Sequence, residues 1–490
     1  MKLSNRSIRI GLTLATILYF FLIRWCAHLG FHTTFADLYF FDHPVWNFIH
    51  GRGLFLNIEN MHEFGNHFYP YLYVLAPLYL IKCSPVWLFL VQGITMGLLA
   101  YPILSLAEQW FGRKGLLSAA FILFTTYSFR HIGMVDFHGD IVMAMLLSWS
   151  LYFIVTKQFR LLWIPIILMP LGKETFFIIT IPLGLYLIYK KQFTQGILVV
   201  VYSALVAYVL IHFVMPMFHS YSHFRFYDYL GATPKEIIIN AILKPQLVLA
   251  QLLRSEKIAY VLLLLAPLAF LSLRSSLFWV GSLVFLQNLL SNQPGLTDPS
   301  NHYAAPFIPI LAFSTMQVIQ KIQLRPKEKQ QKIMKIFKRT VIGFAVINLL
   351  AFVILEVRYF IPTQGWKDVK KAVSLVPADA SVLGTSTTLT HLYYRQYFNR
   401  ENGSPFEYMI FRPVTSVSTE QFIGWWNTKQ RARAIRYLTT GESFGPFEDS
   451  LSASQMKEMI SRASYTLLVD APTVRLYKKN VSSKISATSK

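Results

Sequence analysis

The chain has 490 residues, of which 54% are hydrophobic and 14% are charged, and its apolar residues form long runs rather than amphipathic stripes. Runs of about 16 to 23 apolar residues can cross a bilayer, and they exclude a soluble globular protein. The net charge of +22 is densest in residues 321–339, where eight basic residues and one acidic residue lie between two apolar segments. No aromatic platform accompanies this charge, so we interpret it as a cytoplasmic loop facing anionic lipid and expect no nucleic-acid partner.

The N-terminal segment predicts an uncleaved membrane helix. Three basic residues precede a long apolar run, as they do in a signal sequence. No small-x-small cleavage site follows, and Trp25 disrupts a lipobox before Cys26. Cys26 and Cys83 have no metal-ligand spacing and do not form a disulfide framework.

Eleven apolar segments are predicted to cross the membrane: 8–29, 86–107, 115–132, 138–156, 160–172, 174–189, 195–217, 258–272, 276–291, 303–320 and 340–361. With the N-terminus in the cytoplasm, the basic connections at Arg113, Lys157, Lys190 and Arg274 all lie inside, as the positive-inside rule requires. If the segment 67–82 also crossed the membrane, Arg113 and Lys114 would lie outside. We therefore predict that it forms a helix along the outer surface. The sequence therefore predicts a multi-pass protein of a bacterial inner membrane.

The acidic residues of this membrane part are distributed unevenly between its two sides. Of the 14 acidic residues in 1–361, this threading puts 12 outside: Asp37, Asp42, Glu59, Glu63, Asp136, Asp140, Glu174, Asp228, Glu236, Glu256, Asp298 and Glu356. Acidic residues have little influence on orientation, so the asymmetry needs another cause. We interpret it as the mark of an outward-facing site.

The long first outer loop, residues 30–66, contains the first candidate residue, Asp37. From the residues alone, the better interpretation of Asp37 is a cap of a surface helix. The loop ends at His67, which leads into the predicted surface helix.

The second outer connection contains Asp136, His138 and Asp140. In an extended loop, a spacing of two residues points these side chains to the same side, where their oxygen and imidazole ligands can meet one divalent cation. The alternative is that these groups form hydrogen bonds that only hold the loop in place.

Charged and aromatic groups mark two further outer connections. Lys173 and Glu174 lie at the tip of a tight hairpin of two short spans, either as a helix-capping ion pair or as groups that bind a phosphate and orient it or a metal. His302 and Tyr303 open the tenth span, where they can contact substrate or anchor the helix at the interface.

The composition changes near Pro362, where we place a domain boundary between a membrane part, 1–361, and a terminal part, 362–490. Strand candidates at Ala380–Gly384, Glu407–Phe411 and Tyr465–Asp470 alternate with helical stretches near 365–376 and 454–463. This alternation predicts a small α/β domain outside the cytoplasm. No phosphate loop or catalytic elbow occurs in it, so we expect a role in substrate recognition or in covering the site.

Five motifs taken together resemble an uncharacterised bacterial family of predicted membrane proteins, the domain of unknown function 2079. They are the early Asp37, the His67-Phe68-Tyr69-Pro70 turn, the segment from Asp136 to Asp140, the Lys173-Glu174 hairpin and the late His302-Tyr303 pair. That family in turn is similar to the membrane glycosyltransferases of the C-type fold (GT-C). Those enzymes have a catalytic acid in the first outer loop, surface helices after it, a second acidic motif between the third and fourth helices, and often a soluble C-terminal domain. The same landmarks occur here in the same order.

This resemblance implies an all-α, GT-C-like membrane enzyme with a small C-terminal α/β domain. Its donor would be a sugar on a polyprenyl phosphate, and Asp37 would be the general base in an inverting, single-displacement transfer to a glycan, lipid or protein acceptor. Asp136, His138 and Asp140 would hold a divalent cation, Mg²⁺ or Mn²⁺, or the donor phosphate. Lys173 would offset the charge of the leaving phosphate, and His67 would assist there.

Two other functions remain open from the sequence. A transporter or flippase of a lipid-linked saccharide would also need an acidic, aromatic cavity, although transporters usually carry ionisable groups near the bilayer midplane and show internal repeats. A non-catalytic membrane assembly protein would use the same loops to bind a partner, and its function would be unaffected by Asp37→Asn.

Overall fold

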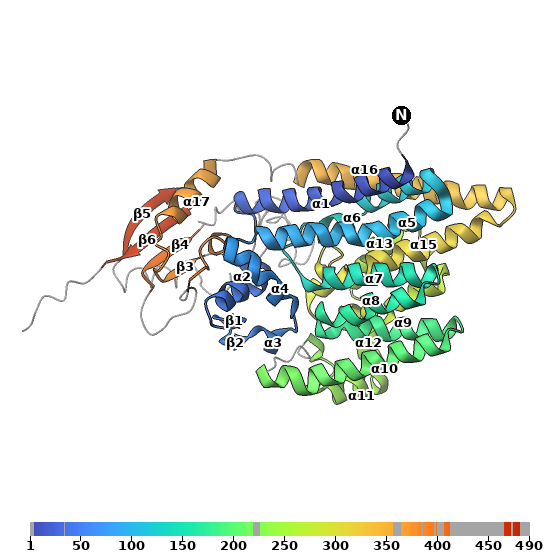
Figure 1. Cartoon of the computed structure of the whole chain (residues 1–490), viewed down its shortest axis with the longest axis horizontal. Helices are drawn as coiled ribbons and strands as arrows, with labels where there is room; N and C mark the ends of the chain where they lie inside the picture. Colours follow the sequence, from blue (N-terminus) through green and yellow to red (C-terminus); the bar gives the residue numbers. More distant parts are fainter. Residues whose placement is uncertain are drawn as a thin grey trace, which may run out of the picture. The chain divides into compact units, whose positions relative to one another are not determined.

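The computed structural model describes residues 4–33, 35–218, 226–355, 364–384, 386–395, 398, 406–411, 465–471 and 474–480. The chain divides into two compact units, and Figure 1 shows the elements of each. The first unit comprises Met1–Ile23, Met61–Leu75 and Val86–Ile354, and the second comprises Arg24–Asn60, Ala76–Pro85 and Leu355–Lys490. The domain boundary expected at Pro362 lies outside the described residues.

The first unit is built of helices. Its α-helices are α3 (Glu63–Asn66), α5 (Val86–Thr125), α6 (Tyr127–Ile132), α7 (Gly139–Val155), α8 (Phe159–Leu168), α9 (Phe177–Tyr189), α10 (Phe193–Val209), α11 (Pro234–Leu243), α12 (Pro245–Leu252), α13 (Ser255–Leu265), α14 (Ser282–Leu290), α15 (Phe307–Gln323) and α16 (Lys327–Leu355). Four short 3₁₀ helices bear on the sites described below: η1 (Met169–Leu171), η2 (Glu174–Phe176), η8 (Ser276–Gly281) and η10 (His302–Ala304). Helix α5 packs on α7, α7 on α8, and α9 on α10 (Figure 1).

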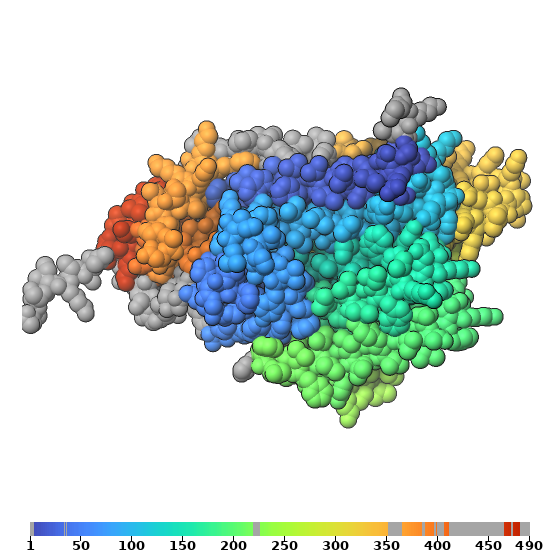
Figure 2. Space-filling view, viewed as in Figure 1, coloured from blue at the N-terminus to red at the C-terminus, as the bar shows by residue number. Residues whose placement is uncertain are grey.

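Four helices in the described part of the chain are long and apolar enough to cross a membrane: Asn5–Leu29 (α1), Val86–Thr125, Phe193–Phe218 and His302–Gln323. The surface of α10, green in Figure 2, illustrates why these are membrane helices. Its exposed side chains include Ile197, Val201, Leu205 and Tyr208, each more than half exposed. An apolar face of this kind is stable against lipid rather than water.

The break in α5 agrees with the predicted connection between the spans 86–107 and 115–132. Gly112 has φ 65° and ψ −159°, which no helix accommodates and which a residue with a Cβ rarely adopts. Arg113 and Lys114 follow this break directly and are exposed. The basic pair thus lies at a turn of the chain.

Other predicted spans are made of shorter pieces. Helix α13 is followed by a turn in which Ala269 and Phe270 have positive φ values, and η8 leads into the short α14. The end of the last predicted span, residues 356–361, lies outside the described residues. The total of eleven crossings therefore stays a prediction.

Helix α4 (Tyr71–Ile81) corresponds to the predicted surface helix. Its 11 residues extend about 16 Å at 1.5 Å per residue, and the hydrocarbon core of a bilayer is about 30 Å thick. A helix of this length does not cross by itself, in agreement with the assignment from the basic residues.

The second unit contains α2 (Phe35–Ile49), α17 (Gln364–Ser374), α18 (Ser386–Leu389) and a four-stranded sheet. The strands are β3 (Val382–Gly384), β4 (Tyr408–Phe411), β5 (Tyr465–Ala471) and β6 (Val474–Lys479), in the order β3-β4-β6-β5. The pair β3 and β4 is parallel and the other two pairs are antiparallel. The second unit also contains the short strand β1 (Phe55–Leu56), whereas the short strand β2 (Met61–His62) belongs to the first unit.

Three of the four sheet strands lie where the sequence predicts strands, and α17 lies where it predicts a helix. Strand β6 pairs with both β4 and β5 and is not among the strand candidates named from the sequence. The helix expected at 454–463 lies outside the described residues. An α/β arrangement of the whole segment 362–490 remains a proposal.

Candidate functional site

Two glycines bring the second and third predicted site segments together. A Cβ on Gly139 would lie 2.3 Å from the carbonyl oxygen of Gly172 and 2.6 Å from Cε1 of Tyr69, and a Cβ on Gly172 would lie 2.7 Å from Cγ of Met143. Only residues without a side chain permit this approach of two backbones. The start of α7 therefore lies against the turn between η1 and η2.

A buried amide fixes the loop that precedes α7. The Nε2 group of Gln92, on α5, donates hydrogen bonds to the carbonyl oxygens of Gly133 at 2.9 Å and Val135 at 2.7 Å. His138 is the extended N-cap residue of α7, and Asp140 lies in the first helical turn. The partial positive charge at a helix N-terminus stabilises a carboxylate at this position.

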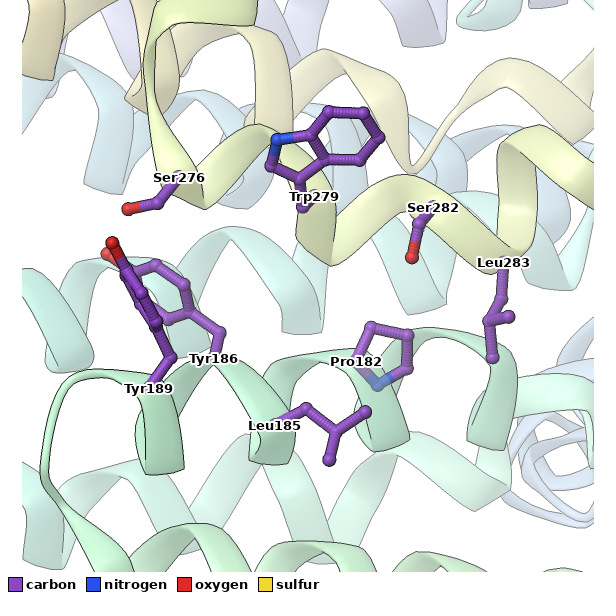
Figure 3. Close-up of a pocket in the computed structure, with 8 residues that line it drawn as sticks. All are labelled: Pro182, Leu185, Tyr186, Tyr189, Ser276, Trp279, Ser282 and Leu283. Carbon is purple, nitrogen blue, oxygen red and sulfur yellow. The ribbon is translucent and has the colours of Figure 1, made fainter.

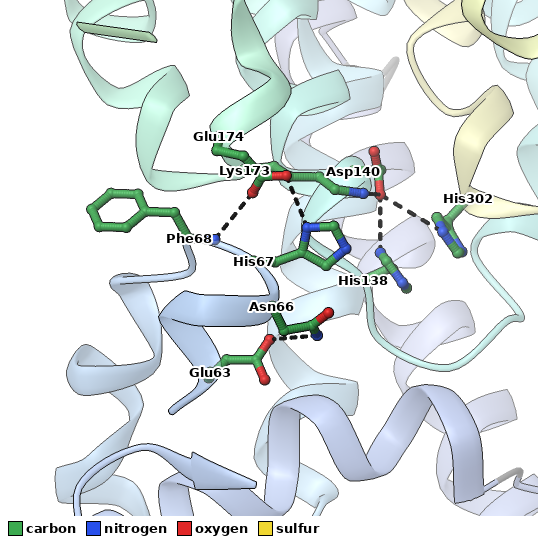
Figure 4. Close-up of polar contacts among 9 residues, drawn as sticks. All are labelled: Glu63, Asn66, His67, Phe68, His138, Asp140, Lys173, Glu174 and His302. Atoms are coloured by element: carbon green, nitrogen blue, oxygen red, sulfur yellow. Dashed lines mark hydrogen bonds and ion pairs between the residues drawn. The ribbon is translucent and has the colours of Figure 1, made fainter. Parts of the chain in front are cut away.

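Asp140 is the centre of a buried polar cluster (Figure 4). Its Oδ2 atom accepts hydrogen bonds from Nδ1–H of His138 at 3.0 Å and from the ammonium group of Lys173 at 3.1 Å. The Nε2 atom of His302 lies 3.8 Å from the same oxygen. All four side chains are buried, so the opposite charges of Asp140 and Lys173 compensate each other in a site with little solvent exposure.

Aromatic rings enclose this cluster. The rings of His138 and His302 stack with centroids 3.3 Å apart, and the ring of Tyr303 lies 4.0 Å from that of His302. The Nζ atom of Lys173 lies 5.3 Å from the centroid of the Tyr303 ring, within the range of a cation–π interaction. The structure thus brings His302 and Tyr303 to the two segments that the sequence singles out separately.

Glu174 forms a second polar centre beside the first. One carboxylate oxygen lies 2.9 Å from Nδ1 of His67, and the other accepts a hydrogen bond of 3.0 Å from the backbone N–H of Phe68 (Figure 4). In the part of the chain that the structure describes, Lys173 forms its ion pair with Asp140 and not with Glu174. The capping ion pair considered from the sequence is therefore not what this hairpin forms.

Burial and the neighbouring carboxylates shift the pKa values of His67 and Lys173 in opposite directions. Burial lowers the pKa of His67, and the adjacent Glu174 carboxylate opposes this shift only in part. Burial alone would lower the pKa of Lys173, but the Asp140 carboxylate outweighs it and the pKa is raised. Lys173 is thus a permanent cation, whereas His67 is held neutral.

The cluster contains one group of residues that fits a metal ion. The ligand atoms of His138, Asp140 and His302 lie within 4.8 Å of one another. Two imidazoles and one carboxylate suit Mn²⁺ better than Mg²⁺, which prefers oxygen ligands. Lys173 contacts the same carboxylate oxygen and adds a positive charge that opposes a cation.

Asp136 is not a member of this group, although the sequence places it with His138 and Asp140. The predicted convergence assumes an extended chain through residue 140, but Asp140 is already in the first turn of α7. Alternation of side chains stops where a helix begins. Asp136 is buried and lies before that point.

Two buried groups of the cluster keep hydrogen-bonding capacity. An ammonium group has three N–H donors, and among the described residues Lys173 donates only to Asp140. The Nε2 atom of His302 has no hydrogen-bond partner among the same residues. Buried polar groups in this state usually bind water, an ion or a ligand.

The predicted base, Asp37, belongs to the second unit. It is half-buried and lies in the first turn of α2. A carboxylate at this position stabilises the helix through its dipole. Its role as a base stays a prediction.

A buried carboxyl that the sequence analysis does not select lies five residues further along α2. Asp42 accepts hydrogen bonds from the hydroxyls of Tyr79, Tyr393 and Tyr394, the last at 2.5 Å. Burial raises the pKa of Asp42 to about 6, although the three hydroxyls oppose the shift. The sequence holds no periodic signal for this cluster, because the tyrosines come from α4 and from the segment after α18.

The chain matches a known family of membrane proteins. The family described as "Predicted membrane protein (DUF2079)" matches residues 27–449. The chain belongs to this family. The match covers both units, so the polar cluster and the Asp42 site lie within the family's extent.

Among solved structures, the chain is similar to that of ArnT from Cupriavidus metallidurans bound to undecaprenyl phosphate. The sequence identity is 12% and the TM-score is 0.47, with 96% of this chain and 98% of that chain covered. No curated protein matches the chain.

Proposed function

We propose that this DUF2079 protein is a membrane glycosyltransferase that moves a sugar from a polyprenyl-phosphate donor to an acceptor. The observation that carries this proposal is the buried cluster around Asp140 and Glu174. It combines one permanent cation, Lys173, with three imidazoles, those of His67, His138 and His302. A phosphate group in a membrane protein needs a cation with free N–H donors, as Lys173 has among the described residues, because water is excluded there.

The donor phosphate would bind to the N–H groups of the cluster that have no partner among the described residues. Lys173 has two N–H groups beyond the one that contacts Asp140, and these would donate to phosphate oxygens. Asp140 keeps the ammonium group in place, and Glu174 keeps the ring of His67 in place. A divalent cation at His138, Asp140 and His302 would supply further positive charge to the same phosphate.

Asp37 would act as the general base. It would take the proton of an acceptor hydroxyl or amine, whose oxygen or nitrogen then attacks the anomeric carbon of the sugar. The bond from that carbon to the phosphate oxygen breaks, and the phosphate leaves with the electron pair. Lys173 would stabilise the charge that develops on this oxygen. A single displacement inverts the anomeric configuration.

The orientation in the membrane follows from the basic residues. We place the N-terminus and the turn at Arg113 in the cytoplasm, and the polar cluster and the segment 362–490 on the outer face. The bacterial inner membrane fits this arrangement, with residues 1–361 as the transferase part.

Sugar transfer in membranes from expressing cells tests this function. Polyprenyl-phosphate sugars are supplied to wild type, Asp37→Asn, Lys173→Gln and Lys173→Arg. We expect Lys173→Gln to lower the rate roughly 100-fold or more, because one donor to the developing charge is lost. Lys173→Arg keeps the charge and should retain part of the activity. Asp37→Asn should abolish transfer.

Two exposed residues of the same types provide controls. Lys244→Gln and Asp228→Asn change groups that are exposed on the first unit, and transfer should stay at the wild-type rate. Protein level and elution from a sizing column establish that each variant is folded. Full activity of both Lys173→Gln and Asp37→Asn contradicts the assigned site. Absence of transfer by the folded wild type with every donor offered contradicts the enzyme and favours a flippase or an assembly protein.

A further inference from the structure

A cavity separate from the polar cluster opens between α9 and the segment η8–α14. Its volume is about 510 Å³, and it is lined by Pro182, Leu185, Tyr186, Tyr189, Ser276, Trp279, Ser282 and Leu283 (Figure 3). Leu185, Tyr189 and Trp279 are each more than half exposed, so the cavity is an open groove and not an enclosed void. Neither the proposed transfer nor any site residue named above uses it.

The groove is polar at one end and largely apolar at the other. The hydroxyls of Tyr186, Tyr189 and Ser276 gather at one end in Figure 3. Pro182 and Leu283 lie toward the opposite end, where the hydroxyl of Ser282 is the polar group. A groove of this kind fits an elongated occupant with an apolar body and a polar terminus.

A basic residue, Lys190, lies at the polar end. Lys190 directly follows α9, and its Nζ atom lies 5.5 Å and 5.1 Å from the ring centroids of Tyr186 and Tyr189, both of which line the groove. Burial lowers the pKa of Lys190, and the charge of Lys321 lowers it further. Arg274 lies two residues before Ser276.

The described part of the chain does not neutralise these cations. Among the described residues, no acidic side chain forms an ion pair with Lys190, Lys321 or Arg274. When the charge of one lysine lowers the pKa of another, an anion bound near both stabilises their charged forms. The polar end therefore fits a negatively charged group.

We infer that this groove binds an anionic phospholipid, with an acyl chain along α9 and α14 and the headgroup phosphate at Lys190. Trp279 and Tyr189 have the character of residues at the level of lipid headgroups, where aromatic rings are enriched. An apolar protein segment in the groove would leave Lys190 and Lys321 without an anion, so the charges favour an anionic lipid.

Quenching of tryptophan fluorescence by brominated lipid tests this site. The full chain is purified in detergent, depleted of lipid and titrated with dibromo-acyl phosphatidylglycerol or with the uncharged dibromo-acyl phosphatidylcholine. We expect saturable quenching at several-fold lower concentration of the anionic lipid. This component should disappear in Trp279→Phe. Adding Leu185→Trp to that variant should restore it, because Leu185 lines the same groove.

A matched pair of lysine variants tests the headgroup contact. Lys190→Gln should weaken binding of the anionic lipid about fivefold. This corresponds to about 1 kcal/mol, the contribution of one basic residue at the membrane surface. Lys157 is an exposed lysine after α7 and does not line the groove, so Lys157→Gln should leave the titration unchanged.

Three results would overturn the inference. Equal quenching by both lipids would indicate annular lipid without a site. An equal effect of Lys157→Gln and Lys190→Gln would indicate general surface charge. Loss of quenching together with a larger particle on a sizing column would mean that a second copy of the chain covers the groove. None of these readouts depends on sugar transfer, so the result stands apart from the proposed function.

Discussion

His138 and His302 lie face to face, with ring centroids 3.3 Å apart and ring planes inclined by 8°. One precedes α7 and the other opens η10, so segments far apart in the sequence meet at this point. Both rings adjoin Oδ2 of Asp140, at 3.0 Å and 3.8 Å. The stacked pair therefore connects the tenth predicted span to the proposed phosphate site.

Removal of one imidazole should weaken cation binding. We expect His302→Asn to raise the dissociation constant for Mn²⁺ about 10- to 100-fold, because one of three ligands is altered. Titration of the purified protein with Mn²⁺, followed by electron paramagnetic resonance of the free ion, measures this. His212→Asn alters an exposed histidine on the first unit and serves as the control. Equal affinities of wild type and His302→Asn would remove His302 from the proposed metal site.

Lys173 distinguishes a cation site from a phosphate site. Lys173→Met removes a positive charge 3.1 Å from Oδ2 of Asp140, so it should strengthen Mn²⁺ binding and weaken binding of a polyprenyl phosphate. The two dissociation constants should change in opposite directions. A decrease in affinity for both ligands would mean that Lys173 mainly maintains the fold of the cluster.

The close approach at Gly139 should be essential for transfer. In Gly139→Ala the new methyl group would lie 2.3 Å from the Gly172 carbonyl oxygen, so the two segments must separate. We expect a loss of about 1–3 kcal/mol in stability and of about 100-fold in transfer rate. Gly11→Ala is the matched control, since no heavy atom lies within 4 Å of its Cβ position. A Gly139→Ala protein with full activity would show that the spacing of the two segments is unimportant.

The protonation of Asp42 should affect stability between about pH 4 and pH 6. The pKa of this carboxyl is raised from 3.8 to about 6, so the folded state binds the proton more tightly than the unfolded state does. The stability that this proton contributes is present below pH 4 and is lost as the pH rises through 6. The loss amounts to about 3 kcal/mol.

Thermal unfolding of wild type and Asp42→Asn in detergent tests this sign. The stability of Asp42→Asn relative to wild type should rise by about 3 kcal/mol from pH 4 to pH 7, because the variant lacks the titrating group. The exposed Asp228→Asn should show little change over the same range. A relative stability of Asp42→Asn that falls with rising pH would mean that the tyrosine hydroxyls, and not burial, determine the pKa.

The orientation can be tested with single cysteines in a protein that carries Cys26→Ser and Cys83→Ser. Lys114→Cys lies at the turn after Gly112 and should react with an impermeant maleimide only after the cells are permeabilised. Lys235→Cys lies in the predicted outer connection before α13 and should react in intact cells. Both positions are exposed. The reverse labelling pattern would invert the proposed topology.

The sequence by itself determined the membrane class, the break near Arg113, the short helix α4 and three strands of the sheet. These features depend on local properties: the length of an apolar run, the position of basic residues and the alternation of side chains. The sequence also selected six of the residues that meet in the cluster or beside it: His67, His138, Asp140, Lys173, Glu174 and His302.

Only the tertiary structure decided which of these groups meet. Lys173 and Glu174 are adjacent in sequence, yet one contacts Asp140 and the other contacts His67. His302, and not Asp136, joins His138 and Asp140 in the group whose ligand atoms could hold a metal ion. The partners of a buried charge are set by how closely helices pack, and here the contact at Gly139 brings distant segments within hydrogen-bonding range. Such contacts produce no periodic pattern or change of composition in the sequence. The tyrosines around Asp42 could not be predicted for the same reason.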